Sequence, residues 1–151
     1  MSRIDLRLDY WPMVITVLPD EVTEAALGPY FNSFLSSVLG KREKFVSVVD
    51  AMAVSHAPSA RVRQRIAEWE DLHMDLGVQY NLGIAIATSS VLVRGAMTAI
   101  HWVVPPRVPT VFEPTVSDAV DWAVKRLEHE GIRLPPLVRA YGAKGAAAGG
   151  R

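Results

Sequence analysis

Short apolar runs alternate with longer amphipathic segments between Lys44 and Asp121, and this pattern predicts an α/β fold. At the start of the chain, apolar and polar residues alternate from Ile4 to Tyr10, which is the period of a strand with one face on the core. A nearly continuous apolar strand follows from Met13 to Leu18. The connection at Trp11 and Pro12 is too short for a parallel crossover, so we expect an antiparallel hairpin.

Three further strands and four helices are predicted downstream of this hairpin. The strands are the β-branched runs at 44–50, 82–88 and 110–112. The helices, which carry apolar residues at helical spacing, are expected at 20–39, 59–77, 90–104 and 115–130. The repeated order of strand, helix and strand favours right-handed parallel crossovers. The sequence therefore predicts a single mixed five-stranded sheet, with an N-terminal antiparallel hairpin followed by parallel crossovers, flanked by four helices.

Capping and breaking residues set the expected helix ends. Helix starts are predicted at three sets of hydroxyl residues: Ser59, Ser89 or Ser90, and Thr115. Helix ends are predicted at Gly40, Gly77, Pro105 and Gly131. Pro29 lies inside the first helical segment and removes one backbone hydrogen bond, so we expect a kink or a restart near Gly28 and Pro29.

Length and composition indicate one domain. A chain of 151 residues, half of them hydrophobic, can bury about two-thirds of the surface that its unfolded form exposes. We place the domain at residues 1–133. The segment 134–151 is rich in Gly, Ala and Pro and has few large apolar groups, so we expect a flexible C-terminal tail.

Charge and cysteine content narrow the classes of partner. Sixteen basic and sixteen acidic residues give zero formal net charge, which removes the global electrostatic argument for a nucleic-acid partner. The absence of cysteine suits the cytoplasm, and the N-terminus shows no secretory signal. The longest apolar run, 91–104, is interrupted by Arg94 and His101 and is shorter than the roughly 20 residues of a membrane-spanning helix, so we expect no transmembrane segment.

Three arginines open the helix at 59–77, where the helix dipole is already positive. Arg61, Arg63 and Arg65 there could attract an anion, a phosphoserine or an acidic protein surface. In the alternative reading, which we favour, Arg65 pairs with Glu68 and the other two are solvated. The apolar stripe of this helix consists of Val62, Ile66, Trp69, His73 and Leu76. The charged residues, Glu68, Glu70 and Asp71 among them, are assigned mostly to its solvent side.

The helix at 90–104 carries a second candidate surface. Arg94, Thr98 and His101 project from one side of an otherwise apolar cylinder. They could line a pocket for a polar head group, with Trp102 in its apolar wall. The alternative, which we favour, is that the three residues form the solvent stripe of a helix packed on a sheet. Trp102 near the helix end then suits a dimer surface.

No residue pattern specifies catalysis, a metal or a cofactor. The four histidines, at 56, 73, 101 and 129, come from separate elements and lack metal-ligand spacing. Asp50 ends a buried strand at the sheet edge where α/β folds place chemistry, but a single carboxylate makes no enzyme. We expect Asp50 to cap the following loop.

Four segments give the chain a family resemblance: KFVSVVD, SARVRQRIAEWE, VLVRGAMTAIHWV and VFEPTVSDAVDWA. Together they resemble the SpoIIAA-like group of STAS domains, over roughly residues 4–130. The resemblance implies a non-enzymatic module that binds other proteins. Some members are switched by phosphorylation of a serine at the start of the helix after the third strand. The matching region here, 50–61, lacks the Asp-Ser-Ser-Gly motif and has Ser55 and Ser59 at later positions.

From these observations we expect a STAS-like, non-enzymatic protein-interaction or regulatory module without a cofactor, with a protein partner or a second copy of itself. Ser55, Ser59 and the three arginines are its candidate partner or anion site. The alternative is a carrier or sensor of a small lipophilic or anionic ligand, bound between the helix at 91–104 and the sheet. Arg94, Thr98, His101 and Trp102 are the candidate ligand or dimer surface.

Overall fold

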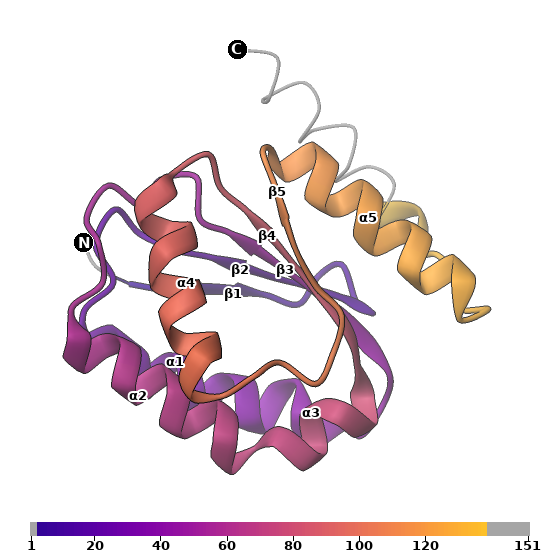
Figure 1. Ribbon diagram of the computed structural model, residues 1–151. Coiled ribbons are helices and arrows are strands. Elements are labelled where there is room, and N and C mark those ends of the chain that lie inside the picture. The colour runs from indigo at the N-terminus through magenta and orange to yellow at the C-terminus, as the bar shows by residue number, and fades with distance from the viewer. Residues whose placement is uncertain (1–2, 139–151) are drawn as a thin grey trace.

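The structure is a computed structural model that describes residues 3–138 (Figure 1). Its strands are β1 (Asp5–Arg7), β2 (Met13–Val17), β3 (Phe45–Asp50), β4 (Asn81–Ala87) and β5 (Thr110–Glu113). Its helices are α1 (Glu24–Ser37), the 3-10 turn η1 (Leu39–Lys41), α2 (Ala60–Leu72), α3 (Met74–Tyr80), α4 (Val91–Val103) and α5 (Val116–His129).

The strands form one mixed five-stranded sheet in the order β1-β2-β3-β4-β5. Strand β1 pairs antiparallel with β2, and the other neighbours pair in parallel. The predicted hairpin followed by parallel crossovers is therefore confirmed. The ladder between β3 and β4 shifts register between Phe45 and Ser47.

The helices are divided unequally between the two faces of the sheet. Helix α5 lies on one face, and α1, α2, α3 and α4 lie on the other (Figure 1). The predicted helix at 59–77 is two helices, because the chain leaves helical geometry at His73, where φ is −109° and ψ is 15°. Gly77 lies inside α3 rather than at a helix end.

The local signals for helix ends are largely confirmed. Ser59, Ser90 and Thr115 each accept a hydrogen bond from a backbone N–H of the first turn. Gly131 follows α5 with φ of 73°, a left-handed conformation that glycine adopts without steric cost. The expected restart near Pro29 is wrong, since α1 continues from Glu24 through Pro29 to Ser37.

Alternation along the strands sends different side chains to the two faces. On the α5 side, β2 and β3 present Met13, Ile15, Val46 and Val48, which are fully buried with the α5 residues Ala119, Ala123 and Leu127. On the opposite side, the same strands present Thr16, Ser47 and Val49. This second face is covered by the apolar residues of α1 to α4.

Helix α5 approaches the sheet closely. A Cβ atom placed on Gly83 of β4 would lie 2.5 Å from the ring of Trp122, so only glycine fits there. The Arg126 Nε atom also donates a hydrogen bond of 2.9 Å to the carbonyl oxygen of Leu82. These contacts hold α5 close against β4.

The start of the segment predicted as a tail packs on the same side. Val138 is fully buried among the α5 residues, and Leu134 packs against that cluster. The rest of the predicted tail, residues 139–151, lies outside the described residues. No helix within residues 3–138 has the length and apolar character needed to cross a bilayer.

Candidate functional site

A cavity of about 250 Å³ lies between the sheet and the helices α1 to α4. Its floor is formed by β2, β3, β4 and β5, with Ser47, Val49, Ile84 and Ile86 facing it. Most of its lining is apolar. The lining residues Val78 of α3 and Pro106 and Arg107 of the α4–β5 connection are exposed, which places the mouth of the cavity between these two segments.

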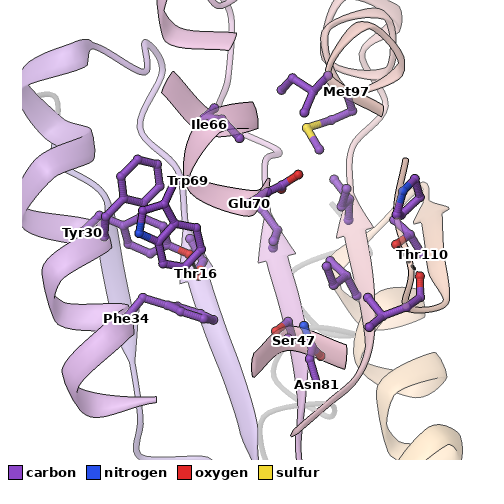
Figure 2. A pocket seen from close by; sticks show the side chains of 18 of the residues that line it. Thr16, Tyr30, Phe34, Ser47, Ile66, Trp69, Glu70, Asn81, Met97 and Thr110 are labelled. Atoms are coloured by element: carbon purple, nitrogen blue, oxygen red, sulfur yellow. Dashed lines mark hydrogen bonds between the residues drawn. The ribbon is translucent and has the colours of Figure 1, made fainter. Parts of the chain in front are cut away.

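Aromatic side chains line the wall beside α1 and α2. The ring of Trp69 stacks on Phe31, with centroids 4.8 Å apart and planes 9° apart, and meets Phe34 edge-on at 5.7 Å. Figure 2 shows Tyr30, Phe34 and Trp69 grouped on one side of the pocket. Such ring contacts fix the geometry of this wall.

Two polar groups of this wall satisfy each other. The hydroxyls of Thr16 and Tyr30 are 2.9 Å apart and share a hydrogen bond. Burial raises the pKa of Tyr30 to about 12, so its phenol stays protonated at neutral pH. Each hydroxyl is therefore engaged by the other, and the Tyr30 phenol does not act as a base.

Glu70 of α2 also lines the cavity, and its carboxyl has no hydrogen bond or ion pair with any residue in the described range 3–138. In Figure 2 it lies between the aromatic wall and Met97 of α4. Burial raises the pKa of Glu70 from 4.5 to about 7, because the apolar surroundings disfavour the charged form. The carboxyl therefore changes charge near neutral pH.

Three basic side chains line the same cavity. Burial lowers the pKa of His101 on α4, so its imidazole is neutral at physiological pH. The Nδ1 atom of His73 lies 2.9 Å from the Trp69 carbonyl oxygen and bonds to it. Arg107 is exposed at the mouth.

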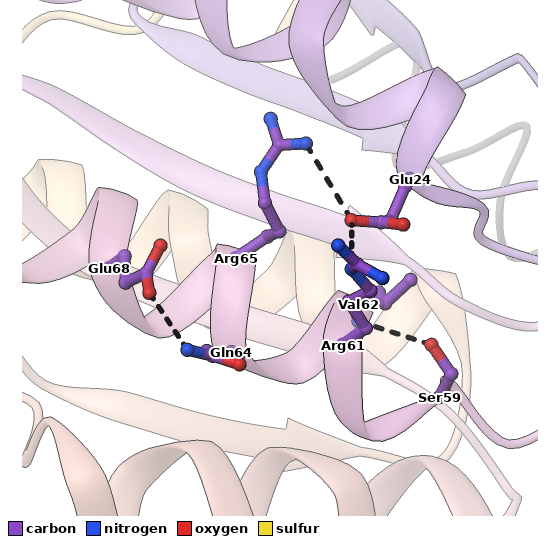
Figure 3. A network of polar contacts seen from close by, with 7 residues as sticks. All are labelled: Glu24, Ser59, Arg61, Val62, Gln64, Arg65 and Glu68. Carbon is purple, nitrogen blue, oxygen red and sulfur yellow. Dashed lines mark hydrogen bonds and ion pairs between the residues drawn. The ribbon is translucent and has the colours of Figure 1, made fainter.

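Two arginines of the predicted site, Arg61 and Arg65, lie beside an acidic residue of α1 (Figure 3). Arg61 Nε lies 3.3 Å, and Arg65 Nη1 4.0 Å, from the same carboxylate oxygen of Glu24 on α1. Arg65 thus pairs with Glu24 rather than Glu68, whose carboxylate accepts a hydrogen bond from Gln64. Two of the three cations are therefore partly neutralised by one acid.

The other members of that site have local roles. Arg63 Nη1 donates a hydrogen bond of 2.7 Å to the carbonyl oxygen of Pro58. The Ser59 hydroxyl caps α2 by accepting from the N–H of Val62 at 3.1 Å. The Ser55 hydroxyl lies 3.1 Å from His56 Nδ1 in the exposed loop before α2.

The predicted surface on α4 divides between two environments. His101 faces the cavity, whereas the Trp102 side chain is 83% exposed. The Arg94 guanidinium lies 5.4 Å from the centroid of the Phe112 ring, and Thr98 donates its hydroxyl hydrogen to the Arg94 carbonyl at 2.8 Å. Of the four candidates, the structure therefore places His101 in the lining of the cavity.

Metal and carboxylate candidates are also placed by the structure. Within residues 3–138, no group of three or more His, Asp or Glu side chains is arranged to hold a metal ion. Asp50 accepts a hydrogen bond of 3.1 Å from the Met52 N–H, as expected for a loop cap.

The sequence interpretation missed Glu70 and Ser47. It assigned Glu70 to the solvent side of its helix, although Val62, Ile66 and Glu70 follow one another at intervals of four and so share the inward face. Ser47 stands in the middle of an apolar strand, and its buried Oγ has no hydrogen-bond partner among the described residues. In both cases the sequence shows a polar residue at a position where the apolar pattern predicts an inward-facing side chain.

The architecture defines an α/β domain with a mixed sheet, and comparison with known proteins identifies the particular fold. No protein-family model matches the chain, and no curated protein matches it. The chain is similar to the crystal structure of an uncharacterised protein of the DUF3478 family with a SpoIIAA-like fold from Shewanella loihica PV-4. The TM-score is 0.52 at 18% identity, over 80% of this chain and 91% of the other. This chain therefore has a SpoIIAA-like fold, as its resemblance predicted.

Proposed function

We propose that this protein is a non-catalytic binding domain whose cavity between the sheet and α1 to α4 holds a small lipophilic molecule. The volume and apolar lining of the cavity carry the proposal. At about 250 Å³ it exceeds the cavities of about 150 Å³ that bind benzene in other proteins, and it approaches the lower end of ligand pockets. It lies between α4 and the sheet, where the sequence placed its alternative ligand site.

Binding rather than reaction is proposed because of the arrangement of the lining groups. An acid–base mechanism needs a second group within hydrogen-bond reach of the first. In the part of the chain that the structure describes, the carboxyl of Glu70 has no such partner, and the Tyr30 hydroxyl is engaged by Thr16. These groups suit ligand recognition.

Protein recognition is the second candidate, as the resemblance to SpoIIAA-like modules implies. Exposed apolar side chains on α4 support it, since Val91, Trp102 and Val103 are all more than 70% exposed. We expect a partner, or a second copy of the chain, to cover them. Sedimentation of wild type and of Trp102→Ser tests self-association, which the substitution should weaken. A protein that is monomeric at all concentrations counts against the second copy.

Native mass spectrometry of freshly purified protein, followed by titration, tests the ligand proposal. We expect a retained small-molecule mass, or saturable binding of the neutral fluorescent probe N-phenylnaphthylamine by the emptied protein. Ala96→Phe places a ring from α4 into the cavity and should weaken probe binding at least about tenfold.

The matched control is Ala99→Phe, an exposed position on the same helix, which should leave probe binding unchanged. A clean apo mass together with no saturable probe binding overturns the proposal. Equal loss of binding in both variants would place the probe outside the cavity.

A further inference from the structure

The cavity contains an ionisable group that the protein itself leaves uncompensated, and this feature bears on the class of ligand. Burying a carboxylate in an apolar environment is costly unless an opposite charge or hydrogen-bond donors accompany it. Glu70 has neither among the described residues, although its side chain lines the cavity. A cationic ligand in this space would supply the missing opposite charge.

The charged and titratable groups around Glu70 do not serve as that partner. Tyr30 on α1 is held by Thr16, and His73 at the end of α2 bonds the Trp69 carbonyl. His101 on α4 is neutral at physiological pH, and Arg107 lies exposed at the mouth. None of the four lies within ion-pair or hydrogen-bond distance of the Glu70 carboxyl.

The surroundings of Glu70 suit a cation with an apolar body. The aromatic rings of Tyr30, Phe34 and Trp69 stand to one side of the carboxyl (Figure 2). A desolvated carboxylate attracts an ammonium group through a charge-assisted hydrogen bond. The remaining lining, which includes Val49, Ile86 and Met97, offers apolar contact for the rest of the molecule.

We propose that the ligand is a lipophilic amine whose ammonium group pairs with Glu70, while its apolar part lies between α4 and the sheet. This inference rests on the proposed function, because it assumes that the cavity is a ligand site. An alcohol of the same length would fill the same space without compensating the carboxylate. A fatty acid would add a second negative charge beside it.

The experiment compares three probes that share one alkyl chain: decylamine, decanol and decanoate, each below its solubility limit and, for the two ionic probes, below its micellar concentration. Isothermal titration with the full chain at about pH 8.5 measures their affinities, because Glu70 is then largely ionised and the amine is protonated. We expect the amine to bind roughly ten- to a hundredfold tighter than the alcohol, the range that hydrogen bonds to charged groups provide. Decanoate should bind more weakly than either.

Two variants on α2 locate the source of that preference. Glu70→Gln keeps the shape of the side chain and removes its charge, so the amine and the alcohol should bind it almost equally. Glu68→Gln is the matched control, because Glu68 is exposed on the same helix, and it should keep the wild-type preference.

A measurement on the wild type alone covers the case in which Glu70→Gln does not fold. The ratio of amine to alcohol affinity should fall about tenfold between about pH 8.5 and about pH 5.5, as Glu70 takes up a proton. The same fall in folded Glu70→Gln would show that a group other than Glu70 carries the pH dependence, and it would overturn the inference.

The outcomes separate the two proposals. Failure of all three probes to bind wild type, together with a clean apo mass and no binding of N-phenylnaphthylamine, overturns the proposed function itself. Equal binding of the amine and the alcohol, tighter binding of decanoate, or an amine preference that survives in Glu70→Gln overturns only the amine inference.

Discussion

The two faces of the sheet are built from the same strands but packed in opposite ways. On the α5 face, β4 presents Ala85 and Ala87, and the small residues Ala119 and Ala123 allow the helix to approach closely. On the other face, β4 presents Ile84 and Ile86, and the helices enclose a cavity. Alternation along a strand thus lets one sheet pack tightly against a helix on one side and form the wall of a cavity on the other.

Truncation of one large side chain on each face gives the largest expected contrast. Leu127→Ala on α5 removes a fully buried side chain and should lower the free energy of unfolding by about 3 to 4 kcal/mol. Met97→Ala on α4 borders space that already exists and should cost about 1 kcal/mol. Urea denaturation measures both. Similar losses would mean that the faces are equally packed.

Enlargement of an alanine tests the contrast in the reverse direction. Ala123→Leu inserts atoms beneath α5 where no space is left, so we expect a loss of about 2 to 3 kcal/mol. Ala96→Leu extends into the cavity and should change the free energy of unfolding by less than about 1 kcal/mol. Thermal unfolding of the two variants measures both changes in stability. A large loss of stability in Ala96→Leu would contradict the expected difference in packing between the two faces.

Glu70 makes the stability of the native state depend on pH. Below about pH 4.5 its carboxyl is protonated in both the folded and the unfolded chain, so it contributes no penalty. As pH rises towards 7, the unfolded chain ionises first, and the native state loses up to about 3 kcal/mol of stability relative to acid pH.

Glu70→Gln should therefore be more stable than wild type by about 1 to 3 kcal/mol above pH 7, and the gap should close below about pH 4.5. Denaturant titrations across this range measure the difference. A constant difference between the two proteins at every pH would show that Glu70 does not carry the effect.

The smallest expected change in stability comes from a substitution at Ser47. Its buried hydroxyl lacks a hydrogen-bond partner in the described part of the chain, and leaving such a group unsatisfied is costly. Ser47→Ala should therefore raise the free energy of unfolding by about 1 kcal/mol. Destabilisation by a similar amount would indicate that the hydroxyl has a partner, such as an ordered water.

The sequence predicts those parts of the fold that depend on local chemistry. Strand periodicity and the hydroxyls of Ser59, Ser90 and Thr115 specify their elements through neighbouring backbone groups, so one sequence is enough to find them. The break at His73 was not predicted. There the histidine ring bonds the Trp69 carbonyl, while Trp69 stacks on Phe31, a residue of another helix.

The candidate site was less accessible to prediction, because a cavity depends on how far a helix stands from the sheet. The sequence placed a ligand site between α4 and the sheet as an alternative, and it included His101. It also assigned Glu70 to solvent, although the period of α2 turns that residue inward. The pairing of Arg61 and Arg65 with Glu24 could not be predicted either, because Glu24 is distant in the sequence.

Two tryptophans stand in opposite surroundings, and this gives the protein a built-in optical reporter. Trp69 forms part of the cavity wall, whereas Trp102 is 83% exposed. An aqueous quencher such as iodide will suppress the emission of Trp102 first. In a background in which Phe replaces Trp11, Trp102 and Trp122, the light emitted by Trp69 then follows the filling and emptying of the cavity without any added dye.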